Sequence, residues 1–586
     1  MTTELRELVN KLKSFANRLA KEDASQLVCQ DRRGLIYNTR LPQPKSPSIS
    51  NTAAFLRLRN LYPTAAPNIT DEEVKSWTGL VVADLHEKEQ ELNKDIGYEQ
   101  KLEAAYKLAH SCWSLNLKAE NEFSDWVSEY CKSWLLRKHP RIPTMYMLHL
   151  SSSVLDDPSG NVRSLIAGVA EDVVWRQLAA CSHSNPIDFD PIELSIGLTL
   201  CASAIPNRDF RLACQKLNDA TSKSGTWVVR PHTVLPSCSS LYAVVACIGC
   251  NSISEDETLL DSIVAHAKWL LNSASRHGTW LGSDLTHRIG GAEPWFNFLA
   301  IDFAFRIAEW LSGRLQSDLL RAYSARFKFD KVVKWRDLLL DDDARLALSK
   351  AFIEPIKTKG PGVSLSRCTA ILFGPPGTAK TTIAEALASE VEWPLIEIGV
   401  SDFLAQGINS VFAQSKTIFD HLLSLSRVIV LLDEVEGVFA NRDDKEAETF
   451  QKLLTSSLLP YLKRLRDRAS IILLIATNHI NRFDAAVQRP GRIDLIIPVG
   501  PPSKESRKKL LKAMGINGAI LDQAADSTDK ATIGELEPVK DFVSTAKNNF
   551  AEFTSAWNLA RGSRRLITDE QLKEFQSAAE IFKRLN

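Results

Sequence analysis

The chain has 586 residues, in which 71 Lys and Arg residues balance 71 Asp and Glu residues. A formal net charge of zero and a pI near 7.2 exclude a bulk electrostatic field that would draw the chain to nucleic acid or to an anionic membrane. The length exceeds what one hydrophobic core usually serves, which predicts at least two domains.

The N-terminal residues 1–15 are predicted to form a charged amphipathic helix that lacks the apolar segment of a signal peptide. No apolar run of about 18 residues occurs, so no membrane segment is expected. Ten cysteines are spread through apolar stretches, which favours buried reduced thiols and predicts a cytoplasmic protein. Cys247 and Cys250 form a CxxC pair without a second pair at metal-ligand spacing, so we interpret them as part of a packed helix.

Residues 1–325 are predicted to be all-α, and the pattern repeats. Prolines or glycines that open an apolar helix recur 45 to 58 residues apart, at Pro47, Gly97, Pro143, Pro191, Pro236 and Pro294. Two units carry a Gly-Thr-Trp turn, at 225–227 and 278–280. This spacing is typical of stacked helical hairpins. The turns resemble those of the α/α toroid found in terpenoid cyclases and protein prenyltransferases, with an irregular helical domain as the alternative.

A catalytic toroid would need clustered carboxylates for Mg²⁺ or for acid catalysis. The nearest candidates are Asp156 with Asp157, and Asp188 with Asp190. Both pairs lie beside residues typical of loops, so the sequence favours a non-catalytic helical domain.

After about residue 340 the pattern changes to that of an α/β domain. Apolar runs rich in β-branched residues at 368–373, 428–436 and 470–478 alternate with amphipathic helices, as buried parallel strands do. We expect an α/β domain at 326–500 and a small helical lid at 501–586.

The first of these strands leads into GPPGTAKT at 374–381 and then into a helix over 381–391. Glycine-rich loops of this kind close backbone N–H groups around phosphate oxygens, and the helix N-terminus favours the same anion. Ala379 stands where the pattern usually has glycine, and a left-handed alanine costs about 1–2 kcal/mol. Lys380 would bridge the β- and γ-phosphates, and the Thr381 hydroxyl would coordinate Mg²⁺. The predicted nucleotide-binding residues of the loop are Gly374, Pro375, Pro376, Gly377, Thr378, Ala379, Lys380, Thr381 and Thr382.

Polar residues end the other two strands. Asp433 suits a Mg²⁺ contact and the adjacent Glu434 suits the general base for attack on a γ-phosphate. Asn478 ends the next strand with a neutral side chain able to hold the attacking water. Arg489 and Arg492 flank a Pro-Gly turn, and such guanidinium groups suit a neighbouring subunit's nucleotide.

This ordered set resembles the AAA ATPase family, in its classical clade, over roughly residues 331–586. The matching elements are the Walker A stretch GPPGTAKT, the Walker B stretch LLDE, Asn478 and the RPGR motif. The resemblance implies ATP and Mg²⁺ as cofactors, adenine contacts at Asp337 and Leu338, a helical lid from Lys504, and a homo-oligomeric ring, a hexamer.

At the position of the family's pore loop the chain has Gly407-Ile408-Asn409, without the aromatic residue of members that thread polypeptides. The sequence therefore predicts an ATPase that remodels or regulates a protein partner recognised by its helical domain. The alternatives are an ATP-dependent scaffold or signalling switch with slow turnover, and a terpenoid-cyclase-like enzyme fused to an ATPase.

Overall fold

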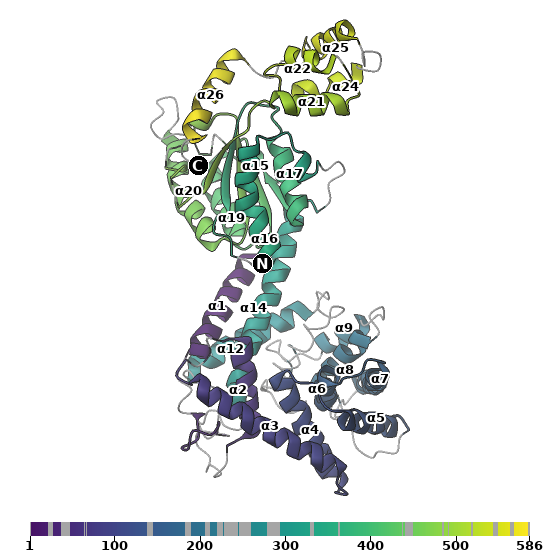
Figure 1. The fold of residues 1–586 in the computed structure, drawn as a ribbon. Coiled ribbons are helices and arrows are strands. Elements are labelled where there is room, and N and C mark those ends of the chain that lie inside the picture. Colours follow the sequence, from purple (N-terminus) through teal and green to yellow (C-terminus); the bar gives the residue numbers. More distant parts are fainter. Residues whose placement is uncertain are drawn as a thin grey trace. The chain divides into compact units, whose positions relative to one another are not determined.

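The structure is a computed structural model of the chain (Figure 1). It describes the following residues: 2–21, 27–36, 47–63, 65, 67–136, 145–181, 189–204, 211–219, 227, 244, 259–277, 294–327, 333–360, 364–435, 438–439, 449–482, 484, 486–489, 491–516, 518, 520–542, 549–562 and 568–583. The CxxC pair, Asp188, Pro143, Pro236, the second Gly-Thr-Trp turn, and Gly225 and Thr226 of the first such turn lie outside these residues.

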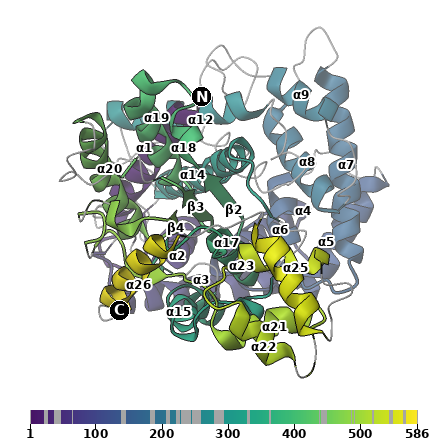
Figure 2. The ribbon, with the colours of Figure 1, turned by 90° about the horizontal axis from the view of Figure 1, so that it is seen from above.

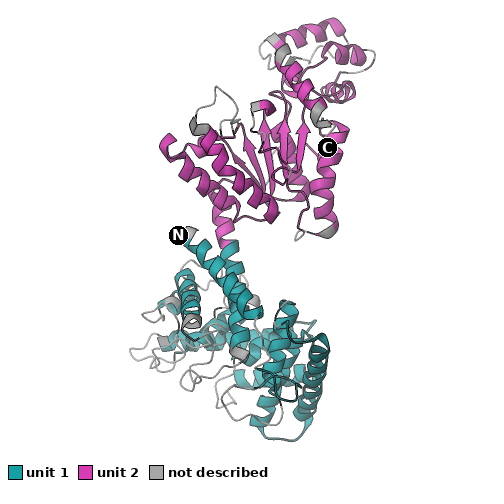
Figure 3. Cartoon of the chain, turned by 90° about the vertical axis from the view of Figure 1, so that its left-hand side faces the viewer, with its two compact units in different colours: residues 1–313 teal, residues 314–586 magenta. Residues whose placement is uncertain are grey.

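The chain divides into two compact units, Met1–Gly313 and Arg314–Asn586 (Figure 3). The division falls within one helix, α14 (Pro294–Ala322), which contributes side chains to the hydrophobic cores of both units. The domain limits drawn from the sequence, with the first at residue 325, stay a proposal. Among the described helices, none is both long enough and apolar enough to cross a membrane.

The first unit is built from helices, as the sequence predicts. Those described are α1 (Thr2–Lys21), α2 (Ile49–Leu61), α3 (Asp71–Asn93), α4 (Tyr98–Leu115), α5 (Asn121–Leu135), α6 (Met145–Val154), α7 (Asn161–Cys181), α8 (Pro191–Ala204), α9 (Arg211–Asp219), α12 (Leu260–His277) and the first part of α14.

These helices pack in two series. By their contacts, α2, α4, α6 and α8 follow one another in that order, and α3, α5, α7 and α9 form a second series. Figure 2 shows α7 of the second series beside α8 of the first. Residues that the sequence marks as helix openers begin the first series: Gly97 is the N-cap of α4, and Pro191 is the first residue of α8. Pro294 likewise begins α14, and Pro47 precedes the Ser48 N-cap of α2. The repeat read from the sequence therefore corresponds to one helix of the first series per unit, and a closed toroid stays a proposal.

The second unit contains a five-stranded parallel sheet in the order β2-β3-β4-β1-β5. The strands are β1 (Thr369–Phe373), β2 (Leu395–Ile398), β3 (Ile429–Asp433), β4 (Ile472–Thr477) and β5 (Leu495–Pro498). Their side chains are almost all buried, because helices cover both faces of the sheet.

Alternate strand residues enter two separate cores. On one face Ile371 and Leu432 pack with α19 (Val411–Leu422), α20 (Thr449–Arg468) and the end of α14. On the other face Leu372 and Leu431 pack with α15 (Asp342–Leu348), a π-helical turn at Ser349–Ile353, α16 (Glu354–Lys359) and α17 (Lys380–Val391). Short helices η3 (Trp335–Asp337), α18 (Val400–Phe403), η5 (Ile408–Ser410) and η6 (Ile480–Arg482) lie in the connections.

The C-terminal helices α21 (Lys504–Ala513), α22 (Ile520–Ser527), α23 (Ile533–Leu536), α24 (Val539–Phe542) and α25 (Phe550–Gly562) share a small core of their own. The last helix, α26 (Asp569–Lys583), instead packs against the sheet, where the Phe575 ring lies 5.8 Å from the Phe373 ring. The predicted order of helical region, parallel α/β domain and helical lid is confirmed.

Candidate nucleotide-binding site

The site lies at the carboxyl ends of three neighbouring strands. β4 lies between β1 and β3, and their registers pair Phe373 with Thr477 and Asp433 with Ala476. The three strands therefore end at the same level, and the polar residues that follow them are brought together. This is where open α/β sheets bind ligands.

The loop after β1 has a backbone that few residues tolerate. A Cβ atom added at Gly374 would lie 1.9 Å from the carbonyl oxygen of Val499, so no side chain fits there. Gly377 is left-handed, with a φ of 75°. Ala379 is left-handed as well, with φ 67° and ψ 36°, although alanine carries a Cβ. The backbone of the usual glycine is thus kept at Ala379, at the cost in strain that the sequence analysis anticipated.

Lys380 opens α17 and points back over the loop. Its ammonium group is largely buried and donates to the carbonyl oxygens of Gly374 (2.7 Å) and Pro375 (3.1 Å). It also donates to the Asn478 side-chain oxygen at 2.8 Å, which joins the end of β4 to the loop after β1. A positive charge and the N-terminal amides of α17 therefore meet at one place, which favours a phosphate group.

The side chains of Thr381 and Asp433 place two oxygen atoms beside the loop that could coordinate a cation. The Thr381 hydroxyl donates to Asp433 Oδ2 at 3.5 Å. Burial raises the pKa of the Asp433 carboxyl, and the charges of Glu397 and Glu434 raise it further while Lys380 lowers it. A cation beside this carboxylate would offset the cost of its ionisation.

Glu434 follows Asp433 in an exposed position and has a φ of 52°. Left-handed backbone at a residue with a long side chain is a strained arrangement that recurs at functional sites. The exposed Glu434 carboxylate thus differs from that of Asp433, which is partly buried and accepts a hydrogen bond from Thr381.

The two arginines stand apart from this cluster. Arg489 is exposed, whereas Arg492 is partly buried and donates from Nη1 to the Ala486 carbonyl oxygen at 2.5 Å. The intervening Gly491 has a φ of 89°, as a tight turn requires. The structure therefore gives Arg492 a local anchor and leaves Arg489 on the surface.

A cavity of about 450 Å³ adjoins the loop, within the range of small-molecule sites. It brings together the predicted residues Asp337, Leu338, Thr378, Ala379 and Thr382. Its apolar walls and its lid side were not predicted from the sequence, and their residues include Ile383, Val499, Ser506, Lys509, Leu510, Ala513, Ile533 and Glu537. Leu510 and Ala513 are three residues apart, which places them on one face of α21. Nothing in the sequence shows that this face meets the loop.

Local hydrogen bonds hold the cavity walls. Arg345 donates to the carbonyl oxygens of Leu338 (3.1 Å) and Leu340 (3.0 Å), which fixes the segment before α15. The backbone N–H of Gly534 donates to the Gly377 carbonyl oxygen at 3.0 Å, which joins the lid to the phosphate loop. A movement of the lid would therefore act directly on the backbone of the phosphate loop.

These residues fit a magnesium nucleotide. The apolar cavity suits a base, the loop and Lys380 suit phosphates, and Thr381 with Asp433 offers the oxygen ligands that Mg²⁺ takes beside phosphate oxygens. The parallel sheet, the loop after β1 and the acidic end of β3 define the second unit as a P-loop nucleotide-binding domain. Residues 370–501 match the family described as "ATPase family associated with various cellular activities (AAA)". The C-terminal part of the chain therefore contains an AAA ATPase domain.

Curated relatives share this part of the chain. The "Cell division cycle protein 48 homolog" of Archaeoglobus fulgidus is 32% identical over 142 residues, which are 24% of this chain and 19% of that protein. The "Cell division control protein 48 homolog B" of Arabidopsis thaliana is 31% identical over 217 residues, 35% of this chain and 36% of that protein. An "ATP-dependent zinc metalloprotease FtsH" of Lachnoclostridium phytofermentans is 29% identical over 214 residues, with the same shares.

The chain thus spans between 19% and 36% of the length of these relatives. Among solved structures, the FIGL-1 AAA domain is matched over 45% of this chain and 95% of that chain, with 18% identity and a TM-score of 0.35.

Two of the carboxylates considered for a catalytic toroid, Asp157 and Asp190, accept hydrogen bonds at helix starts. Asp157 accepts hydrogen bonds from the Arg163 backbone N–H (2.9 Å) and from the Ser159 hydroxyl (3.0 Å), beside the start of α7. Asp190 accepts from the Ile192 backbone N–H at 2.8 Å, at the start of α8. Within the described residues, no group of three or more His, Cys, Asp or Glu side chains is placed to hold a metal ion.

Proposed function

We propose that the second unit binds ATP with Mg²⁺ and hydrolyses it. The observation that carries this proposal is the contact of Lys380 with both the phosphate loop and Asn478, beside the pair of Thr381 and Asp433. Residues from three strand ends converge there, which a chance match of the loop pattern would not require.

In this proposal the phosphates lie against the loop amides and Lys380, whose charge balances that of the β- and γ-phosphates. Asn478 orients the attacking water, and Glu434 accepts its proton during in-line attack on the γ-phosphate. Thr381 and Asp433 would hold Mg²⁺, which spreads the negative charge of the phosphates. The cavity with Asp337 and Leu338 would take the adenine.

We propose further that the chain acts as a homo-oligomeric ring, a hexamer, in which Arg489 and Arg492 complete the neighbour's site. The exposure of Arg489 supports this, because an arginine finger must be free to reach another subunit's nucleotide. The first unit would then recognise a protein partner that the ATPase remodels or regulates. The described cysteine thiols are free, which supports a reducing, cytoplasmic location.

A slow ATP-dependent scaffold or signalling switch is the second candidate. It is favoured by the segment before α19, where Ile408 is 63% exposed and carries no aromatic ring with which to grip a polypeptide. The rate of ATP turnover with and without added protein substrates separates the two candidates.

The test of the ATPase is Glu434→Gln. We expect this variant to bind ATP as the unchanged protein does and to lose about 10²-fold or more in steady-state hydrolysis, because the proton acceptor is removed while the size and shape of the side chain are kept. The matched control is Glu392→Gln, which alters an exposed glutamate at the far end of α17. Equal turnover in both variants would contradict the role of Glu434, and absence of ATP binding in the unchanged protein would contradict the whole proposal.

A further inference from the structure

The first unit contains a cavity of about 640 Å³ that the proposed ATPase does not use. Its walls include residues of α2, α4, α6, α8 and the first part of α14. Packed protein interiors hold few voids larger than a water molecule, whereas small-molecule sites have about this volume. The cavity therefore has the size of a ligand site rather than that of a packing defect.

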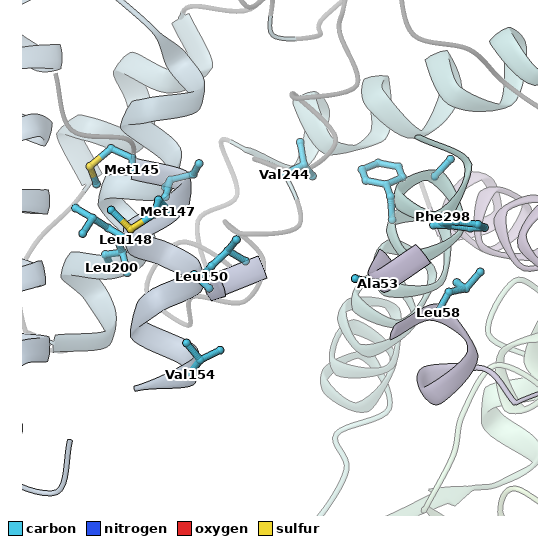
Figure 4. Close-up of a cluster of buried hydrophobic side chains, with 14 of the residues drawn as sticks. Ala53, Leu58, Met145, Met147, Leu148, Leu150, Val154, Leu200, Val244 and Phe298 are labelled. Atoms are coloured by element: carbon cyan, nitrogen blue, oxygen red, sulfur yellow. The ribbon is translucent and has the colours of Figure 1, made fainter. Parts of the chain in front are cut away.

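Much of the wall is apolar. Ile192 and Ile196 lie one turn apart on α8 and both line the cavity. Figure 4 shows Leu58 of α2 and Phe298 of α14 on one side of a cluster of buried side chains, with side chains of α6 on the other side. Leu61 also lines the cavity and is 44% exposed, so the cavity reaches the surface there. A ligand with an apolar body would remove this wall from water, which is favourable.

One polar side chain in the wall lacks a partner. His110 lies on α4 between Tyr106 and Trp113, and its ring centre is 6.3 Å from the centre of each of their rings. His110 is 9% exposed, and its Nδ1 atom has no hydrogen-bond partner among the residues that the structure describes. A buried polar group without a partner is unfavourable, so a ligand that pairs with the His110 ring would remove this deficit.

The His110 ring needs a neutral partner. Burial and the charge of Arg57 lower the pKa of His110 to about 4, so the ring is uncharged near pH 7. A neutral imidazole has one N–H donor and one acceptor nitrogen. A hydroxyl group both donates and accepts hydrogen bonds, so it can pair with the ring in either tautomer.

The charges at the Arg57 and Asp302 side of the cavity balance. The Asp302 carboxylate pairs with Arg306 one turn further along α14, at 2.9 and 3.0 Å. Asp302, Glu309, Arg57 and Arg306 all influence the pKa of Tyr62, which follows Leu61 of the lining, so two charges of each sign lie in this region. An ion that entered the cavity would leave water without meeting a net opposite charge, which is unfavourable. The lining therefore favours an uncharged ligand.

We propose that this cavity binds a neutral, mostly apolar alcohol, whose hydrocarbon body lies against Leu58, Ile196 and Phe298 and whose hydroxyl group pairs with His110. The apolar contacts supply the affinity, and the hydrogen bond fixes the orientation of the ligand. The site lies wholly within the first unit and is distinct from the nucleotide site, so this proposal does not rest on ATP binding.

The test uses the full chain without nucleotide. The reporter is N-phenyl-1-naphthylamine, a neutral compound that fluoresces in apolar surroundings, and the competitors are decan-1-ol, decanoate and decylammonium, which share one chain length. We expect saturable binding of the reporter at one site per chain. Decan-1-ol should displace the reporter at a concentration about tenfold or more below that of either ion, because neither ion meets a net opposite charge.

Three variants locate the ligand. His110→Phe should weaken the binding of decan-1-ol about tenfold and leave the reporter bound, because one hydrogen bond is lost while the apolar wall is kept. Without ligand, this variant should keep or raise the midpoint of thermal unfolding, because a buried polar atom without a partner is removed. Lys107→Met is the matched control, since it removes an α4 charge outside the lining, and it should change neither measurement. Ala54→Trp should prevent binding of both compounds by filling the cavity.

If Ala54→Trp does not fold, as circular dichroism would show, the competition series and His110→Phe decide the matter. Absence of saturable reporter binding, or a folded Ala54→Trp protein that still binds, would overturn the proposal. Displacement by either ion as strong as that by decan-1-ol would overturn the assignment of a neutral ligand. Unchanged affinity for decan-1-ol in His110→Phe would overturn the contact between the hydroxyl group and His110.

Discussion

Ala379→Gly is the substitution that most directly tests whether residues 374–381 form a phosphate-binding loop strained at Ala379. Ala379 is left-handed, and this conformation costs an L-residue about 1–2 kcal/mol. Glycine avoids that cost, but its greater freedom in the unfolded chain offsets about 0.5–1 kcal/mol. We therefore expect the variant to be more stable by about 0.5–1 kcal/mol, a rise of about 1–4 °C in the midpoint of thermal unfolding for a domain of this size.

The same change should keep or modestly raise ATP affinity. The left-handed backbone is already present at Ala379, so the substitution relieves strain without changing the shape of the loop. Calorimetric titration with ATP measures this, and we expect an increase of no more than about fivefold, the equivalent of about 1 kcal/mol.

The matched control is Glu392→Gly at the other end of α17. Glu392 is also left-handed, with φ 57° and ψ 36°, and it is exposed and remote from the cavity lining. Glu392→Gly should raise stability by a similar amount and leave ATP affinity unchanged. A tenfold or larger loss of ATP affinity in Ala379→Gly, with Glu392→Gly unaffected, would refute the reasoning, because the alanine methyl group would then contact the nucleotide.

Three other expectations concern the phosphate site, the oligomer and the first unit. Lys380→Ala should abolish ATP binding in calorimetry, because the charge aimed at the β- and γ-phosphates is lost; unchanged affinity would reassign the loop. Arg489→Ala should bind ATP normally while hydrolysis falls by about 10³ to 10⁵, and mixing it with Glu434→Gln protein should restore part of the activity if the arginine acts between subunits. A mixture as inactive as its components, with monomers in sizing experiments, would exclude that arrangement. In the first unit, burial and the charge of Asp190 raise the pKa of Glu193 to about 7, so the folded chain keeps a proton that the unfolded chain releases above about pH 4.5. The stability present below that pH is lost as the pH rises to about 7, and Glu193→Gln should flatten this pH dependence of thermal unfolding; an unchanged slope would contradict the shifted pKa.

The sequence predicted those features that depend on a few consecutive residues. The strands ending at Phe373, Asp433 and Thr477 were predicted because short apolar runs end in polar residues. A left-handed conformation at Ala379 was considered for a similar reason, because the loop pattern places a glycine there, and the structure has it. These features depend on a few consecutive residues, so their pattern survives in a single sequence.

The cavity walls could not be predicted in the same way. Val499 directly follows β5, and Leu510 and Ile533 lie on α21 and α23, so their contact with the loop depends on how the lid folds over the sheet. Phe575 is a second example, because a Cβ atom at Gly500 would lie 2.7 Å from its ring, and the residues are far apart in sequence. Periodicity shows that a helix has an apolar face but does not show which surface that face covers.

The repeat in the first unit depends both on local sequence signals and on contacts between segments that are distant in sequence. Gly97, Pro191 and Pro294 are among the residues that the sequence predicts to open helices. Each begins a helix that lines the cavity of about 640 Å³ in the first unit. Helices that begin at a regular interval and lie side by side present equivalent faces to a common space, as stacked helical repeats do. The regular spacing of these residues in the sequence thus marks the start of three helices that line the cavity.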